Sequence, residues 1–275
     1  MAVHDRRTRV RYLIVLMLFV ASAFSYGDRF ALSIAGISLS RDLHINPLQL
    51  GYLFSGFSWA YVVAQLPAGG LLDRYGSKRV YGISILCWSA CALLVGFAGY
   101  LPAAIAFTAI FVLRLVSGLT QAPIFPGNGR IVASWFPTAE RGTASAIFNS
   151  SQYFALVLFA PILGWIAHIS GWKQCFWFLG LLGFGLAFVW SRVIHGVKSH
   201  PRINQQEIDY IEQGGGLTNI DPSEGSAQRK PANQLTWAAI KMLLRPRMLV
   251  GIYIGQYCIT TLTWFFLTWF PVYLS

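Results

Sequence analysis

The chain has 275 residues, of which 55% are hydrophobic, 15% are aromatic and only 11% are charged. A soluble domain averages about 25% charged residues, so this composition excludes a soluble globular protein and indicates an integral membrane protein. The formal net charge of +11 could suggest a nucleic-acid partner. The basic residues do not cluster, however; they follow the connections between apolar segments, which argues against nucleic acid.

Six apolar segments long enough to cross a bilayer precede a long polar segment, and most of a seventh follows it. The expected spans are 12–38, 48–71, 80–100, 102–125, 143–168 and 174–193, then 248–273. Pro123 and Pro126 are expected to kink or end the fourth of them. Within the polar segment we expect one short surface helix, stopped by Gly214, and then a linker over 221–234.

This layout predicts an all-α membrane protein with three parts. Residues 1–193 would form a six-helix bundle, 194–247 a polar loop, and 248–275 the first helix of a second bundle. Most of the 21 Lys and Arg residues lie in the N-terminal tail, in alternate connections and after the sixth span. The opposite connections hold only Arg41 and Lys173. This asymmetry places the N-terminus and the long loop in the cytoplasm.

Two adjacent charged residues, Asp28 and Arg29, lie in the middle of the first expected span. A charge at that depth costs roughly 3 kcal/mol or more, and such residues usually have a function. Arg114 lies within the fourth span, and Gln121 follows it two turns later on the same helical face. These charges could bind a substrate and a proton, or they could form a static ion pair that holds helices together. The residues alone leave both readings open.

The second expected span is followed by GGLLDRYGSKR, residues 69–79. Asp73 can bond neighbouring helix ends or Arg side chains, Gly69 would let another helix approach closely, and Gly76 allows a tight turn. The segment is similar to the loop signature of the major facilitator superfamily, and an ordinary charged turn is the alternative. The resemblance implies a gating role for Gly69, Asp73, Arg74, Gly76, Lys78 and Arg79.

Longer segments resemble the anion:cation symporter family of that superfamily, and its bacterial hexarate permeases in particular. They are SYGDR with ALSIAG, the run from Gly51 to Arg79, APIFPGNGRIVASWFPTAERGTASAIFNSSQYF and GIYIGQYCITTLTWFFLTWFPVYL. The resemblance covers nearly the whole chain. It implies the N-terminal six-helix bundle of a two-bundle transporter that works by alternating access in the bacterial inner membrane.

The implied activity is proton-driven uptake of a sugar-acid anion such as glucarate or galactarate, with galactonate, hexuronate or another organic anion as alternatives. No enzymatic activity, cofactor or metal is implied; the proton is the coupling ion, and the partners are the anion, the lipid bilayer and a second helical half. An inactive or truncated half is the remaining alternative.

The same resemblance implies roles for individual residues. Arg29 would bind the substrate carboxylate and Asp28 would carry a proton. Relatives have Glu where this chain has Gln121, and that Glu is regarded as a second proton-coupling group. Since Gln cannot titrate, coupling in this part of the protein is expected to rest on Asp28. Further substrate contacts are expected at Tyr61, Arg114 and Gln152, although interhelical hydrogen bonding is the alternative for the polar residues on these faces.

Overall fold

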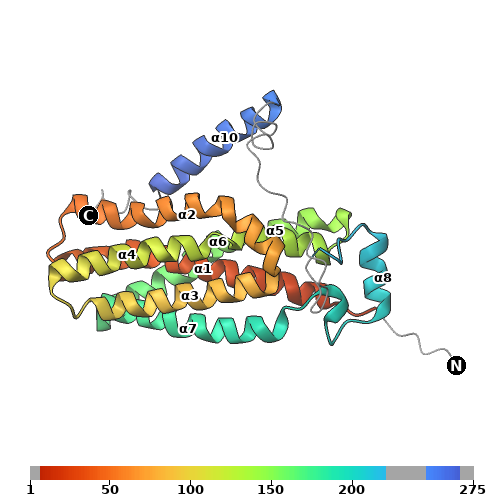
Figure 1. Ribbon diagram of the computed structural model, residues 1–275. Helices are drawn as coiled ribbons and strands as arrows, with labels where there is room; N and C mark the ends of the chain where they lie inside the picture. The colour runs from red at the N-terminus through yellow and green to blue at the C-terminus, as the bar shows by residue number, and fades with distance from the viewer. Residues whose placement is uncertain (1–6, 221–245, 267–275) are drawn as a thin grey trace. The chain divides into compact units, whose positions relative to one another are not determined.

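The structure, a computed structural model, describes residues 7–220 and 246–266. The chain forms two compact units, Met1–Arg229 and Lys230–Ser275. Every described element is a helix (Figure 1), which confirms the predicted all-α class. The long helices of the first unit are α1 (Val10–Asp42), α2 (Pro47–Tyr75), α3 (Ser77–Ala98), α4 (Ala103–Gln121), α5 (Ile124–Trp135), α6 (Arg141–Ser170) and α7 (Trp172–Val193).

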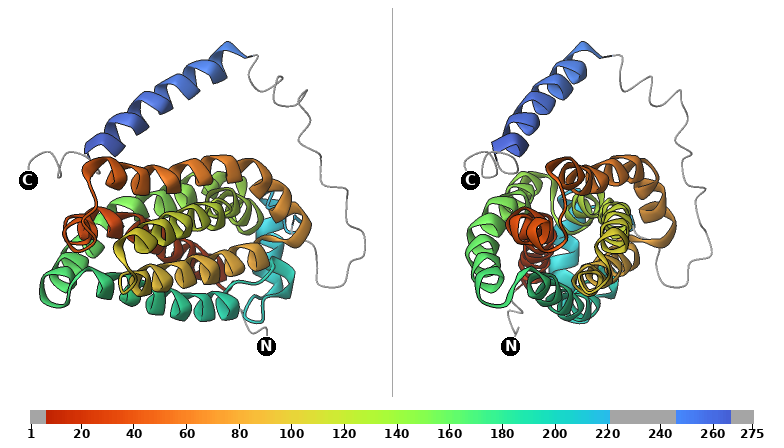
Figure 2. Two further views of the ribbon diagram at one scale, coloured as in Figure 1. Left: turned by 60° about the vertical axis from the view of Figure 1, so that its left-hand side comes forward. Right: turned by 90° about the vertical axis from the view of Figure 1, so that its left-hand side faces the viewer.

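The long helices run side by side in one bundle, seen from its end in the right-hand view of Figure 2. α1 packs along α6 and α7, α3 packs on α7 and α4, and α2 lies against α4. α1 is the most enclosed of the apolar helices: 72% of its apolar 18-residue stretch is buried, against 17–50% for the others that could span a membrane. The element that carries Asp28 and Arg29 is therefore surrounded by protein along most of its length.

Five segments among the described residues are long and apolar enough to cross a membrane. They are α1, α3, the 33-residue stretch that contains α4 and α5, the stretch that ends with α6, and α7. α2, with 29 residues, is also long enough but is not among them, because Gln, Ser, Tyr and Gly residues lower its mean hydropathy. It still belongs to the bundle. A Cβ added at Gly118 of α4 would overlap the carbonyl oxygen of Phe57, so the backbones of α2 and α4 are in direct contact there.

The expected end of the fourth span at residue 125 is wrong. α4 ends at Gln121, but the chain resumes as α5 and stays helical to Trp135. Pro123 precedes α5 and Pro126 lies in its first turn. A proline is tolerated there because the first backbone N–H groups of a helix have no partner within that helix. The two prolines therefore lie at the start of α5 and not only after the end of α4.

The polar segment after α7 is partly folded against the bundle. It contains a short 3-10 turn, Val197–Ser199, and then α8 (Gln205–Gln213), which ends at Gly214 as predicted. The backbone N–H of Thr138 donates to the carbonyl of Gly214 at 2.8 Å, and the N–H of Leu217 donates to that of Ala133 at 2.9 Å. Residues 194–220 are therefore part of the first unit, whereas the expected linker at 221–234 lies outside the described residues.

The second unit contains α10 (Arg247–Trp264), which begins where the seventh span was expected; the rest of that span, to residue 273, lies beyond the described residues. Its glycines Gly251 and Gly255 have no atom within 4 Å of an added Cβ among the described residues.

Candidate functional site

The predicted site is centred on a single amide, the side chain of Gln121. Its Nε2 donates to the Asp28 carboxylate at 2.8 Å, and its Oε1 accepts from the Ser25 hydroxyl at 2.9 Å and from Nε of Arg29 at 3.1 Å. Gln121 is 0% exposed and Asp28 is 3% exposed. The amide of α4 therefore lies between the two charges of α1. Among the described residues no ion pair within 4.0 Å joins Asp28 to an arginine.

Arg29 lies in an aromatic frame. Its guanidinium carbon is 5.1 Å from the ring centre of Tyr26, 5.1 Å from that of Phe57 and 4.6 Å from that of Tyr61. Such contacts stabilise a partly desolvated cation without neutralising it. Only Nε of this half-buried side chain is hydrogen-bonded within the described part of the chain. Its two terminal nitrogens remain able to bind both oxygens of a carboxylate.

Arg114 is placed differently, because it is only 3% exposed. It lies over the ring of Phe176 at 5.5 Å and is an electrostatic neighbour of Asp28. Its Nε and Nη2 have no hydrogen-bond partner among the residues that the structure describes. In this conformation Arg114 is buried inside the bundle beside Asp28, and its expected contact with a substrate stays a prediction.

The two other expected substrate contacts differ in position. Tyr61 lies at the Arg29 guanidinium and stacks on Phe57 at 5.8 Å. Gln152 lies on α6, is half-buried, and makes no hydrogen bond to any described residue. The structure thus brings Asp28, Arg29, Tyr61 and Gln121 together, while no hydrogen bond or ring contact within the described ranges joins Gln152 to them.

The segment expected to act as a gate forms the sharp turn between α2 and α3. Gly76 ends α2 and precedes α3 with a φ of 82°, a backbone conformation that favours glycine. Exposed Asp73 forms an ion pair with Arg130 of α5, and Arg130 also donates to the carbonyl of Ile220 at 2.5 Å. This side of the bundle is therefore linked to the segment that follows α8.

The other expected gating residues lie in or near this turn. The Arg74 guanidinium lies 5.3 Å from the ring centre of Tyr75, and the carbonyl of half-buried Lys78 accepts from the indole of Trp190 at 3.1 Å. Arg79 is exposed at the start of α3. No described helix approaches Gly69 closely, because an added Cβ there would meet no atom within 4 Å among the described residues. The expected close helix approach at Gly69 stays a prediction.

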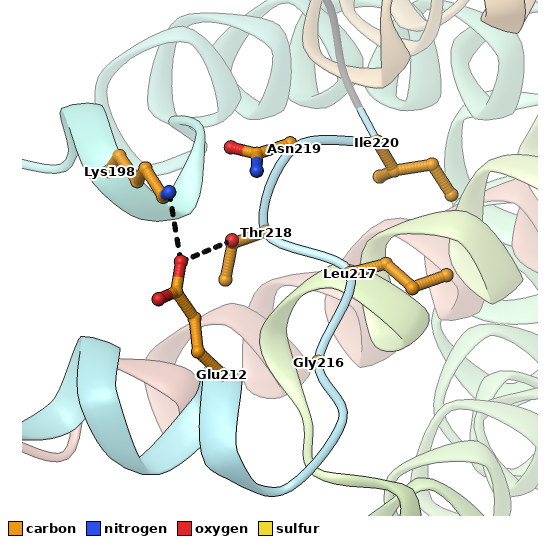
Figure 3. A pocket seen from close by; sticks show the side chains of 7 residues that line it. All are labelled: Lys198, Glu212, Gly216, Leu217, Thr218, Asn219 and Ile220. Carbon is orange, nitrogen blue, oxygen red and sulfur yellow. Dashed lines mark hydrogen bonds and ion pairs between the residues drawn. The ribbon is translucent and has the colours of Figure 1, made fainter.

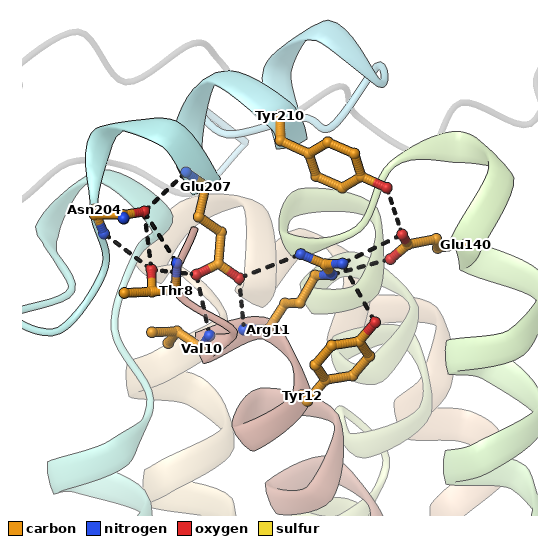
Figure 4. Close-up of polar contacts among 8 residues, drawn as sticks. All are labelled: Thr8, Val10, Arg11, Tyr12, Glu140, Asn204, Glu207 and Tyr210. Carbon is orange, nitrogen blue, oxygen red and sulfur yellow. Dashed lines mark hydrogen bonds and ion pairs between the residues drawn. The ribbon is translucent and has the colours of Figure 1, made fainter. Parts of the chain in front are cut away.

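A partly buried polar cluster at the same end was not expected from the sequence. We call it the clasp: Thr8, Arg11, Glu140, Asn204, Glu207 and Tyr210 (Figure 4). Glu207 of α8 accepts hydrogen bonds from the Thr8 hydroxyl at 2.6 Å and from the backbone N–H of Val10 at 3.1 Å and of Arg11 at 3.2 Å. It thereby caps the start of α1. Arg11 also binds Glu140 at 3.0 Å, and Glu140 accepts from Tyr210 at 2.6 Å.

One local signal could have drawn attention to the clasp. Asn204 precedes α8 and Glu207 follows three residues later, the spacing of a helix-capping box. The Asn204 side chain does accept from the N–H of Glu207 at 3.0 Å, but the Glu207 carboxylate turns to α1 instead of bonding back. The partner on α1 lies some 200 residues away in the sequence, so spacing alone could not identify it.

A surface pocket of about 580 Å³ borders α8, the helix that also carries Glu207 (Figure 3). It is lined by Lys198, Glu212 and residues 216–220, and the Glu212 carboxylate pairs with Lys198 at 2.9 Å and accepts from Thr218 at 2.7 Å. These contacts hold the pKa of exposed Glu212 below its ordinary value. None of the residues predicted to bind substrate or proton lines this pocket.

Comparison with known proteins gives a consistent family. The chain is 53% identical over 270 residues to the probable galactarate/D-glucarate transporter GudP of Escherichia coli K12, covering 98% of this chain and 60% of that protein. It is 46% identical over 264 residues to the probable galactarate/D-glucarate transporter GarP of the same strain, covering 96% and 59%. A D-galactonate transporter of Escherichia coli O6:H1 (strain CFT073) is 37% identical over 267 residues, covering 97% and 60%.

Among solved structures, the MFS proton:xylose symporter XylE bound to 6-bromo-6-deoxy-D-glucose has a TM-score of 0.60 at 14% identity, covering 74% of this chain and 52% of that one. This likeness supports the fold. The chain spans about 60% of the length of the curated relatives it matches. Residues 18–275 match the model of the Major Facilitator Superfamily. With five segments among the described residues long and apolar enough to cross a membrane, the chain is a multi-pass membrane protein and belongs to the major facilitator superfamily.

Proposed function

We propose that this chain forms the first bundle of a secondary transporter, not an enzyme, that brings a sugar-acid anion, glucarate or galactarate, into bacterial cells together with protons. The observation that carries the proposal is Arg29: a partly exposed guanidinium with free terminal nitrogens, in an aromatic frame, one residue from a sealed carboxylate. The names of the most similar relatives supply the substrate class. The second bundle, which would complete the site, is part of the proposal.

The chemistry of Arg29 suits this role. A planar guanidinium can bind a carboxylate through two parallel hydrogen bonds, whereas a lysine ammonium binds as a point charge. The aromatic frame keeps the cation out of bulk water, which strengthens its attraction for an anion. Tyr61 adds a hydroxyl at the same place, suited to the polyol chain of a sugar acid.

Asp28 is the proposed proton carrier, and Gln121 limits what it can do alone. Asp28 is the only carboxylate in the middle of a described membrane helix; Asp42 and Asp73 lie at helix ends. A dianion that enters with one proton carries a net negative charge, and moving it costs about 2.3 kcal/mol per 100 mV of inside-negative potential. Electroneutral uptake would require a second proton site, which Gln121 does not provide.

The Gln121 geometry also explains what a glutamate would do at this position. In a Gln121→Glu protein, the new carboxylate would face that of Asp28 across the 2.8 Å now spanned by the amide. Two carboxylates at that distance share a proton, because both cannot be ionised together. The neutral, proton-donating amide therefore imitates the protonated form of that pair.

We also propose that the N-terminus faces the cytoplasm of a cell whose inner membrane holds the protein. The N-terminal tail, the turn before α3, the start of α6 and the segment after α7 meet at one end of the bundle, joined by the Arg11, Arg130 and Trp190 contacts. These are the basic parts of the chain, and basic connections remain cytoplasmic.

The test is uptake by the full-length transporter in proteoliposomes. Labelled glucarate should accumulate when the outside is acidified, galactarate should compete, and glucose, which lacks a carboxylate, should not. Arg29→Gln should abolish binding and Arg29→Lys should weaken it, whereas Arg41→Gln, at the exposed end of α1, should change neither. Full binding by the Arg29→Gln protein would disprove the proposed role of this arginine.

A second candidate substrate is a monocarboxylate, D-galactonate, favoured by the 37% identical relative named for it. The same assay separates the two. Galactonate should then compete better than glucarate, and one proton would suffice for neutral entry.

A further inference from the structure

Among the described residues, the buried Gln121 amide lies between Asp28 and Arg29. Asp28 is 3% exposed, and its one hydrogen-bond partner among the described residues is Gln121, which is 0% exposed and cannot titrate. If Asp28 carries a proton, as the proposed function requires, the proton must leave in this conformation through the interior of the bundle.

A second buried polar cluster lies further along α1 toward the clasp. It consists of Ser22 (α1), Tyr81 (α3) and Asn128 (α5), which are at most 2% exposed. The Asn128 amide donates to the Ser22 hydroxyl at 2.8 Å. The Tyr81 hydroxyl lies close enough to the Ser22 and Asn128 side chains to interact with both. Neither that hydroxyl nor the Oδ1 of Asn128, however, has a partner at good hydrogen-bond distance and angle in the described part of the chain.

Buried polar atoms are normally satisfied, and ordered water supplies the missing partner where protein does not. Here two unpaired atoms and the Ser22 hydroxyl come from three different helices and meet at one place. Three polar partners are what a buried water molecule usually has. The cluster is therefore suited to hold water.

Ser25 connects this cluster to Asp28. Ser22, Ser25 and Asp28 follow each other at intervals of three residues on α1, so their side chains share one face with about 5–6 Å between successive Cβ atoms. A single water molecule can bridge neighbouring groups at that spacing. At the other end, Tyr81 is the fifth residue of α3, about 7.5 Å along the axis from the turn at Gly76.

We propose that Ser25, Ser22, Asn128 and Tyr81 hold a file of water molecules through which the proton of Asp28 leaves toward the clasp end of the bundle. The Asp28 carboxyl gives its proton to the first water, each oxygen of the file accepts one proton and passes on one, and the last water releases it beyond Tyr81. The amides of Gln121 and Asn128 position water and do not carry the proton.

The transport test compares two modes in the full-length protein in proteoliposomes. Tyr81→Phe and Ser22→Ala should slow uptake driven by a pH gradient about tenfold, the factor given by about 1.4 kcal/mol. Counterflow exchange of labelled for unlabelled glucarate, which needs no net proton release, should stay unchanged. Ser89→Ala is the matched control, because it removes another fully buried hydroxyl of α3, one that bonds only its own helix. Unchanged gradient-driven uptake, or an equal loss in both modes, would overturn the proposal.

The hydration test does not depend on transport. X-ray hydroxyl-radical footprinting labels buried side chains that touch bound water, so Tyr81 should be labelled although it is 0% exposed, while Phe159, which is 5% exposed and packs on Phe24, should not. Equal protection of the two rings would show that the cluster is dry and would overturn the proposal whatever the protein transports. A wild-type protein that is labelled at Tyr81 but takes up no glucarate would instead count against the proposed substrate.

Discussion

Replacing Glu207 with alanine should release α8 from the start of α1. The Glu207 side chain is 0% exposed, and its carboxylate accepts three hydrogen bonds from Thr8, Val10 and Arg11. The Arg11 guanidinium also lies 3.5 Å from the Glu207 carboxylate. Alanine would leave the first N–H groups of α1 without acceptors and remove one of the two carboxylates beside Arg11.

The free-energy cost of Glu207→Ala follows from these contacts. Removing one member of a buried ion pair costs about 3–5 kcal/mol, and hydrogen bonds to a charged group contribute about 1.5–3 kcal/mol each. Because Arg11 keeps its 3.0 Å contact with Glu140, the lower end, about 3 kcal/mol, applies. Every 1.4 kcal/mol is a factor of about ten, so the opening equilibrium of α8 should rise on the order of a hundredfold.

Hydrogen–deuterium exchange of the purified protein in detergent measures this opening directly. In Glu207→Ala, amides of α8 and of the first turn of α1 should exchange about a hundredfold faster, while those of α4 should not change. Glu212→Gln is the matched control, because that carboxylate lies on the same helix, is exposed, and pairs with an exposed lysine. Wild-type protection of α8 in the Glu207→Ala protein would refute the reasoning.

Three further changes have defined outcomes. Gly118→Ala should lower the stability of the bundle by about 1–3 kcal/mol, because the new methyl group would overlap the backbone of α2; the thermal midpoint should fall, whereas Gly185→Ala, which has open space, should leave it unchanged. In Gln121→Glu the rate of glucarate uptake by the full-length protein should depend more steeply on pH. An unchanged pH profile would exclude position 121 from proton coupling. Burial and its neighbour His195 lower the pKa of His200, so unfolding takes up a proton and stability should decline as pH falls below about 6.5. In His200→Asn the loss of stability with falling pH should be smaller. An equal loss would exclude His200 as its source.

The helices could be predicted from sequence because a bilayer allows few alternatives to an apolar helix of about 20 residues. The two departures have physical reasons. α5 was missed because a proline is compatible with both the end and the beginning of a helix, and Pro123 and Pro126 begin one. α2 falls short of the apolar criterion, yet Gly118 lets it pack closely on α4.

The sequence could predict which residues form the site, but not how their side chains are arranged. Asp28, Arg29 and Arg114 could be identified from the sequence because they are charged residues within apolar segments. Which arginine is accessible depends on how α4 is rotated about its axis, and sequence does not determine that rotation. The structure turns Gln121 between the two charges of α1 and seals Arg114. The clasp could not be predicted, since the contacts that join α1, Glu140 and α8 link residues 70 or more positions apart.

α1 is fastened at both of its ends. Glu207 caps its beginning, and the indole of Trp172 donates to Asp42 at its last residue, at 2.9 Å. Arg11 and Arg29 are 18 residues apart on this helix, about 27 Å along its axis. If α1 moves as one rigid rod, a substitution at either fastening should shift the Arg29 guanidinium without touching it. Random mutagenesis for altered substrate affinity should therefore recover changes at the clasp as well as around Arg29, and homologues that differ in affinity can share every residue around that guanidinium.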